Sequence, residues 1–167
     1  YRAAGRGEDW RLFHRLLSWG RFATAPLTLG SAQAVLEIAI DYTGTRFYGG
    51  KAVREHSLQA AMLADMAIGV ESARAYYLQV ASMFDRPDLF GDPSEDFLMA
   101  KGTAAKVYAC DVTQMVCNKA MELMGAYGYI KEFHVEKYLR DSKIFQLWEG
   151  GGQLGRIDAA RGYYPIG

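Results

Sequence analysis

The 167 residues suit a single domain with a hydrophobic core, since half of them are apolar and 13% are aromatic. Nineteen basic residues balance nineteen acidic ones without forming a basic block, so nucleic-acid binding has no electrostatic support. The sequence has neither a run of about 18 uninterrupted apolar residues nor the apolar core of a signal peptide, so we expect no membrane span.

The first long helix is expected between Ser18 and about Thr45, because apolar residues recur there near helical spacing. Pro26 lies inside this stretch and predicts a local kink or a later start. Phe47 to Glu55 contains two adjacent glycines and is typical of a turn. Ser57 is then the expected N-cap of a second helix that reaches about Phe84.

The second predicted helix is apolar on nearly every side, with Asp65, Glu71 and Arg74 as its few charged residues. A helix at the surface of a small bundle should show one polar face. We therefore expect either that this helix is central or that its outer side packs on another subunit.

Three more helices complete the expected fold. Residues 86–93 predict a loop, and Ser94 is the expected N-cap of a helix that stops at Gly125. Helical patterns continue from His134 to Trp148 and from Leu154 to Tyr163. No segment alternates with the period of a strand, so the predicted class is all-α, an antiparallel bundle of long helices.

The two cysteines, Cys110 and Cys117, lie seven residues apart on one face of the third long helix. A disulfide between two positions so placed is geometrically implausible. We therefore expect reduced core cysteines in a cytoplasmic protein.

The most informative stretch is the sequence YLRDSKIFQLWEGGGQLGR, from Tyr138 to Arg156. Glu149 directly follows its apolar part and precedes three glycines. A carboxylate beside apolar walls is a better proton acceptor near neutral pH, and glycines let the backbone approach a ligand closely. Taken alone, however, the pattern favours an ordinary helix C-cap with a solvated glutamate over a catalytic base.

Four motifs favour the catalytic base instead, because together they resemble the acyl-CoA dehydrogenase family over nearly the whole chain. VEKYLRDSKIFQLWEGGGQLGR is similar to the family signature VE-R-RDAKI-QIYEGT-QIQR, and ELMGAYGYIKEF (Glu122 to Phe133) is similar to its Q-I-GG-GY loop. TRFYGGKAVREH (Thr45 to His56) is similar to its R-x-x-FGK turn, and LSWGR (Leu17 to Arg21) to the segment that opens its C-terminal domain.

The resemblance implies that residues 17–167 form the C-terminal helical bundle of a longer protein, and that residues 1–16 are the tail of a middle β domain or linker. It implies FAD as the cofactor. Glu149 would be the base that removes the α-proton of an acyl-CoA thioester while a hydride leaves the β-carbon for the flavin, and its amide N–H would help to polarise the thioester oxygen. Relatives that carry the base on the first helix have it at the position of Gly20, which cannot act as a base.

The family motifs also imply binding residues. Those implied to contact the cofactor are Arg46, Phe47, Tyr48, His56, Ser57, Glu122, Gly125, Ala126, Gly151, Gly152 and Gln153. Those implied to bind substrate are Ser18, Arg21, Trp148 and Gly150. Arg46 matches an arginine that reaches flavin phosphates across a subunit interface, although composition alone equally allows a helix-end arginine that caps carbonyls.

Several positions depart from the family pattern at expected flavin contacts: Gly49, Ser57, Glu122, Ala126 and Gly151. The intact Glu149 nevertheless favours a dehydrogenase of fatty acid metabolism that passes electrons to an electron-transfer flavoprotein and forms a homo-oligomer, either a dimer or a tetramer. The alternative is a non-catalytic assembly or cofactor-binding subunit of a heteromeric acyl-CoA dehydrogenase. An acyl-CoA oxidase is a minor third possibility.

Overall fold

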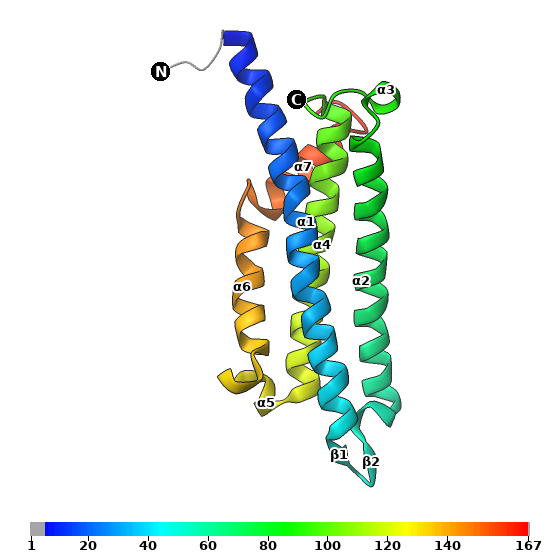
Figure 1. Cartoon of the computed structure of the whole chain (residues 1–167). Helices are drawn as coiled ribbons and strands as arrows, with labels where there is room; N and C mark the ends of the chain where they lie inside the picture. The colour runs from blue at the N-terminus through cyan, green and yellow to red at the C-terminus, as the bar shows by residue number, and fades with distance from the viewer. Residues whose placement is uncertain (1–5, 167) are drawn as a thin grey trace.

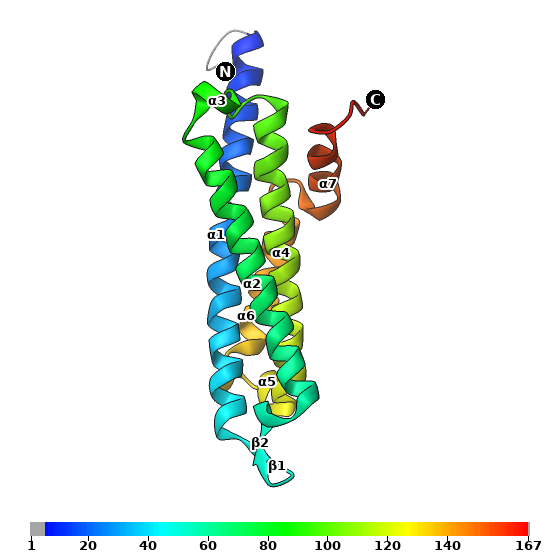
Figure 2. The same cartoon turned by 90° about the vertical axis from the view of Figure 1, so that its right-hand side faces the viewer.

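The computed structural model describes residues 6–166, which form a bundle of antiparallel helices (Figure 1). Three long helices run along the bundle: α1 (Arg6–Thr45), α2 (Ser57–Phe84) and α4 (Asp96–Met124). Two shorter helices, α6 (Val135–Leu147) and α7 (Gly151–Arg161), also pack on α4; in Figure 2, α6 lies behind α4, on the side away from α2, and α7 lies beside α4, on the side opposite α1. The predicted all-α class is confirmed.

Short elements make the connections between the helices. They are the strands β1 (Phe47–Tyr48) and β2 (Lys51–Ala52), the 3-10 turns η1 (Val53–Glu55) and η2 (Lys131–Phe133), and the helical turns α3 (Pro87–Phe90) and α5 (Ala126–Tyr129). The two strands pair as an antiparallel hairpin, with Phe47 opposite Ala52. Gly49 and Gly50 both have positive φ, as a two-residue hairpin turn requires.

The central helix of the bundle is α4, which contacts α1, α2, α6 and α7. The sequence left open whether the second helix is central or packs its outer side on another subunit. The central position was wrong, because only one side of α2 packs against α1 and α4. Its other side exposes apolar residues, among them Leu58, Ile68 and Leu78. The apolar outer face of α2 is a real surface feature, and its packing on another subunit stays a prediction.

Aromatic stacking closes the core at the end of the bundle that carries α7. Phe22 of α1 stacks on Phe84 at 4.7 Å between ring centroids and on Tyr77 at 5.1 Å.

Segment Asp9–Thr45 is long and apolar enough to cross a membrane by length and composition alone, a test that core helices also pass. Buried residues of α1 between Phe22 and Ala39 belong to the bundle core, so packing accounts for part of its apolar character, whereas Trp10, Leu12 and Leu16 near its start are exposed.

Helix starts differ from the sequence expectation more than helix ends do. The first helix begins at Arg6 instead of Ser18 and continues through Pro26. The last begins at Gly151 instead of Leu154, because the glycines after Glu149 enter its first turn. No break in α1 separates residues 6–16 from the bundle, so the domain boundary after residue 16 stays a prediction.

Both expected N-caps were wrong by one residue. Ser57 is the first residue of α2, whose N-cap position belongs to His56. Ser94 uses its hydroxyl to bond the carboxylate of Asp92 at 2.6 Å, and Glu95 takes the N-cap position of α4. At Ser94 the bond to Asp92 competes with capping, which residue type alone does not reveal.

Cys110 and Cys117 are free and buried in α4, as expected. Burial raises the pKa of each thiol to about 11, so neither forms a thiolate near neutral pH. These two cysteines act as small core residues.

Candidate active site

The connection between α6 and α7 carries Glu149. Helix α6 ends at Leu147, and Trp148 turns to extended backbone. Three successive residues then take positive φ: Glu149 (58°), Gly150 (96°) and Gly151 (69°). Glycine adopts this region without steric cost, whereas a glutamate rarely does. Such a conformation persists where the surroundings fix the residue, and it is common at functional positions.

Three side-chain hydrogen bonds from the bundle hold this connection. Arg21 Nε donates to the carbonyl oxygen of Glu149 at 3.0 Å, and Lys106 Nζ donates to the carbonyl oxygen of Trp148. The indole Nε1 of Trp148 donates to Thr24 Oγ1 at 3.0 Å. The backbone on both sides of the Glu149 side chain is therefore anchored to α1 and α4, and the carboxylate does not hang from a free loop.

The Glu149 carboxylate lies directly against Gly20 of α1. A Cβ atom added at Gly20 would lie 2.8 Å from Oε2 and 2.9 Å from Oε1 of Glu149, closer than real Cβ contacts. Oε2 is buried, and no hydrogen-bond partner for it exists among residues 6–166. A buried carboxylate oxygen without a donor requires an explanation, and a role in accepting a proton from a bound molecule supplies one.

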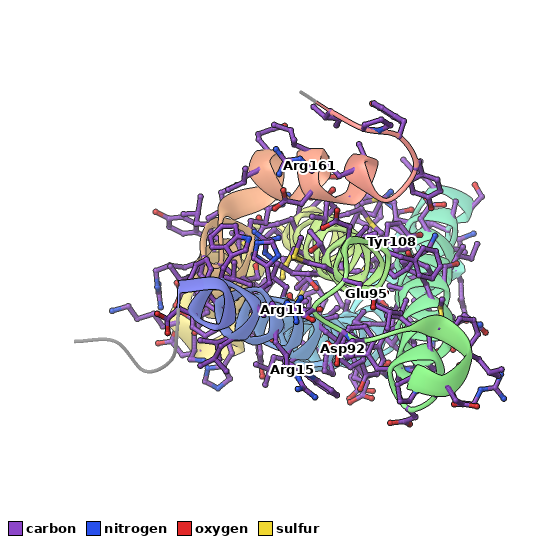
Figure 3. The ribbon with its side chains drawn as sticks, turned by 90° about the horizontal axis from the view of Figure 1, so that it is seen from above. Arg11, Arg15, Asp92, Glu95, Tyr108 and Arg161 are labelled. Atoms are coloured by element: carbon purple, nitrogen blue, oxygen red, sulfur yellow. The ribbon has the colours of Figure 1, made fainter. Side chains whose placement is uncertain are left out.

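Glu149 also lines an open cavity of about 740 Å³ at the end of the bundle where α1, α4 and α7 meet. Figure 3 looks down on this end, with Arg161 labelled on α7. Its apolar walls are Trp10, Phe13, Leu17, Met99 and Leu154, and its polar lining includes His14, Arg21, Asp96, Asp158 and Arg161. Mostly apolar walls with a few charged groups are typical of small-molecule sites. We refer to this cavity as the Glu149 pocket.

A buried ion pair underlies the pocket. Arg21 Nη1 lies 2.7 Å from Asp158 Oδ2, with 4% and 9% of the two side chains exposed. The same nitrogen donates to Thr103 at 3.2 Å, and Asp158 also accepts from Arg161 at 2.9 Å. Asp158 thus balances the buried charge of Arg21. The Nε atom of the same guanidinium orients the Glu149 carbonyl.

The predicted substrate residues fall into two groups. Arg21 and Gly150 line the Glu149 pocket. Ser18 is fully buried in α1, and its hydroxyl has no hydrogen-bond partner within the described residues. Trp148 directs its indole to Thr24 and is not part of the pocket lining. Substrate contacts at all four positions stay predictions.

The predicted cofactor residues lie at two ends of the bundle. Gly151, Gly152 and Gln153 form the first turn of α7, next to Glu149. The others lie around the hairpin and the end of α4, at the opposite end in Figure 1: Arg46, Phe47, Tyr48, His56, Ser57, Glu122, Gly125 and Ala126. Residues 21 and 46 are separated by 25 residues of α1, which is about 37 Å along a helix. One copy of the chain therefore does not bring both groups to one point.

The hairpin end presents an exposed aromatic and cationic surface. The Arg46 guanidinium lies over the ring of Tyr127, 5.6 Å from its centroid, while Phe47 and Tyr48 are largely exposed. His56 bonds the Tyr48 carbonyl through Nε2 at 2.9 Å. The Arg46 side chain is thus turned towards α5, and its contact with a cofactor stays a prediction.

Sequence reasoning missed three residues that position Glu149: Lys106, Thr24 and Asp158. Lys106 carried a usable signal, because it shares one helical face with Ala109, Cys110 and other small or apolar residues. A lysine in such a stripe must either reach the surface or find a buried acceptor. The sequence alone does not identify that acceptor, because Trp148 is 42 residues away.

A protein-family model matches most of the chain. The model described as "Acyl-CoA dehydrogenase, C-terminal domain" matches residues 7–164. The match runs from the second residue of α1 to beyond the end of α7 and includes the connection that carries Glu149.

Individual relatives agree with the family model. The chain is 34% identical over 140 residues to a subunit of the caffeyl-CoA reductase–Etf complex of Acetobacterium woodii, a match that covers 84% of this chain and 35% of that protein. A probable acyl-CoA dehydrogenase of Mycobacterium bovis is 38% identical over 133 residues, covering 80% and 32%. The chain thus spans about a third of the length of these curated relatives.

The fold agrees with a solved structure as well. Butyryl-CoA dehydrogenase from Megasphaera elsdenii superposes with a TM-score of 0.79 at 28% identity, covering 92% of this chain and 37% of that one.

Proposed function

The chain belongs to the acyl-CoA dehydrogenase family, and from this we propose that it is the C-terminal part of an FAD-dependent enzyme that introduces an α,β double bond into an acyl-CoA thioester. Residues 17–167 would be the C-terminal bundle of that longer protein, and residues 1–16 would connect it to a preceding domain. Exposed apolar side chains near the start of α1, including Trp10, Leu12 and Leu16, support a neighbour that covers this end.

The position of the Glu149 carboxylate carries the proposal. One of its oxygens is buried without a hydrogen-bond partner among the described residues, and the side chain faces an apolar pocket. In the proposed reaction this carboxylate accepts the α-proton as the C–H bond breaks, and the electron pair moves towards the thioester carbonyl. Arg21 and Lys106 keep the base in place, because both hydrogen-bond to its connection.

The residues present fit a flavin. The Glu149 pocket has apolar and aromatic walls suited to a planar ring and an acyl chain, and its base has an unused acceptor oxygen. FAD, when bound, supplies the acceptor for the hydride that leaves the β-carbon. Gly151, Gly152 and Gln153 would contact it at this end. Arg46 and the hairpin would serve a phosphate-bearing part of the cofactor held by another copy of the chain.

A homo-oligomer follows from the separation of the two groups of cofactor residues, because each cofactor would need one group from each of two copies. The apolar outer face of α2 supports such association.

An electron-transfer flavoprotein would receive the electrons, as the name of the Acetobacterium complex suggests for its own subunit. The two buried, free cysteines support a cytoplasmic location.

The experiment is to purify the full-length protein, record its visible spectrum and add acyl-CoA thioesters of different chain lengths without oxygen. We expect a bound flavin whose absorbance bleaches with at least one thioester. A protein that stays colourless after incubation with FAD, or a flavin that no thioester bleaches, would favour the non-catalytic subunit instead. Reoxidation by an electron-transfer flavoprotein but not by oxygen would separate a dehydrogenase from an oxidase.

A further inference from the structure

The peptide group between Trp148 and Glu149 has an unusual hydrogen-bond environment. Its carbonyl oxygen accepts from Lys106 Nζ and from the Gly151 amide, the latter at 3.3 Å. Its N–H, which belongs to Glu149, donates to no acceptor within the described residues. One edge of this peptide is therefore bonded to the bundle and the other is available.

Lys106 is an exceptional partner for a backbone carbonyl. It lies in the middle of α4 with 2% of its surface exposed. Burial lowers the pKa of its amine, and the positive charge of Arg21 acts in the same direction. The negative charge of Glu149 and the Cys110 thiol oppose this lowering. Keeping a buried ammonium costs free energy, so its placement under one peptide group needs a reason.

A cationic donor at a carbonyl oxygen changes the other edge of the same peptide. Hydrogen bonds polarise one another through a shared amide, so a bond to the oxygen makes the N–H a stronger donor. The peptide is trans, so its N–H points away from Lys106, and a ligand can bond it while the lysine stays in place. The arrangement is fixed before any ligand binds, which is the condition under which a donor stabilises developing charge most.

We propose that Lys106 is a positioning residue that polarises the Trp148–Glu149 peptide, so that the Glu149 amide becomes a stronger hydrogen-bond donor to the thioester oxygen of the substrate. This inference rests on the proposed function. Arg21 does not serve the same role, because it bonds the carbonyl of the next peptide and its charge is balanced by Asp158.

Two substitutions separate this role from simple support of the connection. Lys106→Gln keeps a donor that can reach a carbonyl but removes the charge. Lys106→Met keeps much of the volume and removes both donor and charge. Support alone predicts that Lys106→Gln resembles the wild type, whereas polarisation predicts that it resembles Lys106→Met. Lys119→Met is the matched control, because Lys119 lies further along α4 and pairs at the surface with Asp65.

The measurement is the carbonyl stretching frequency of a bound 2-enoyl-CoA, labelled with ¹³C at its thioester carbon, in the full-length protein with its flavin. This probe is the reaction product and binds without turnover. We expect a smaller shift to low frequency in both Lys106 variants than in the wild type. The value of kcat should fall by about tenfold, which is a smaller loss than removal of an oxyanion donor causes. In Lys106→Gln, KM and the melting temperature should change less than kcat does. The control Lys119→Met should match the wild type in all of these quantities.

Wild-type frequency in folded Lys106→Gln would overturn the inference, even if Lys106→Met were inactive or failed to fold. Failure of the proposed function has a different signature. In that case the wild type itself would bind the enoyl-CoA without lowering its carbonyl frequency, or no acyl-CoA would bleach its flavin, and the role of Lys106 would fall with it.

Discussion

The Glu149 carboxylate lies in the space directly next to Gly20. The carboxylate fills the volume that a side chain on Gly20 would need. Because the clash involves the end of a flexible side chain, a larger residue at this position should move the carboxylate and leave the helix intact.

Gly20→Ala should therefore lower kcat by about a hundredfold, as a displacement of roughly 1 Å does to a reacting group. Stability should be unchanged or slightly higher, because alanine is favoured over glycine inside a helix by up to about 1 kcal/mol. Gly30→Ala on the same helix is the control, because a Cβ there meets no atom within 4 Å. Equal activity of both variants would show that the carboxylate does not work from this position.

Arg46→Ala should weaken flavin retention and leave the chemical step unchanged in protein that still holds flavin, since a guanidinium binds phosphate oxygens far from the reacting carbons. The ratio of flavin to protein after gel filtration measures this effect. Arg54→Ala, another exposed arginine near the hairpin, is the control. Full flavin occupancy in Arg46→Ala would remove the cofactor role of this residue.

The reacting residue could be predicted from sequence because Glu149 and its glycines form a contiguous motif. Most of its supporting residues could not, because Lys106 and Thr24 bond Trp148 from helices distant in sequence and Asp158 acts only through Arg21. Arg21 was expected near the substrate from its own motif, but its bond to the Glu149 carbonyl was not. The positive φ of Glu149 was also hidden, since a glutamate before a glycine turn gives no sign of left-handed backbone.

Among the helices, α7 is attached to the bundle by charge as well as by packing. Asp158 of α7 pairs with Arg21 of α1 inside the protein, so this pair fixes α7 next to Glu149. Loss of one partner leaves an uncompensated buried charge, which is more costly than the loss of a surface pair.

Asp158→Asn should lower the free energy of unfolding by about 3 kcal/mol, and it should also reduce kcat, because Arg21 orients the Glu149 carbonyl. Thermal unfolding of the full-length protein measures the first effect. Glu71→Gln breaks the exposed Glu71–Arg74 pair and should cost less than about 0.5 kcal/mol. Similar losses in both variants would contradict a buried structural role for Asp158.

The helices themselves were largely predictable, because their apolar periodicity is strong and Phe84 and Gly125 end two of them as expected. Their starts were less predictable. Ser94 bonds Asp92 instead of capping α4, and Pro26 interrupts a periodic pattern without interrupting the helix. Both outcomes depend on neighbours in space, which a linear pattern does not contain.

For the whole molecule, the apolar outer face of α2 is the main unexplained surface. Ile68 and Leu78 remain 63% and 55% exposed on a helix that has only three charged residues, Asp65, Glu71 and Arg74. A monomer with such a face tends to associate.

The protein should therefore sediment as a dimer or larger at micromolar concentration. Ile68→Glu combined with Leu78→Glu should shift it towards the monomer, because charges are costly in an apolar interface. Leu89→Glu, an equally exposed site on α3, should not. A wild-type protein that sediments as a monomer would contradict a role for this face in assembly.

The most direct test of the account is rapid mixing of Glu149→Gln with the best acyl-CoA in the absence of oxygen, followed at the flavin absorbance. The amide keeps the shape of the side chain but cannot accept the α-proton, so flavin should remain bound while its bleaching slows by at least about a thousandfold. Glu37→Gln, at an exposed position of α1 with no assigned role in the site, should leave the bleaching rate near that of the wild type. Bleaching of Glu149→Gln within about tenfold of the wild-type rate would contradict the assignment of Glu149 as the base.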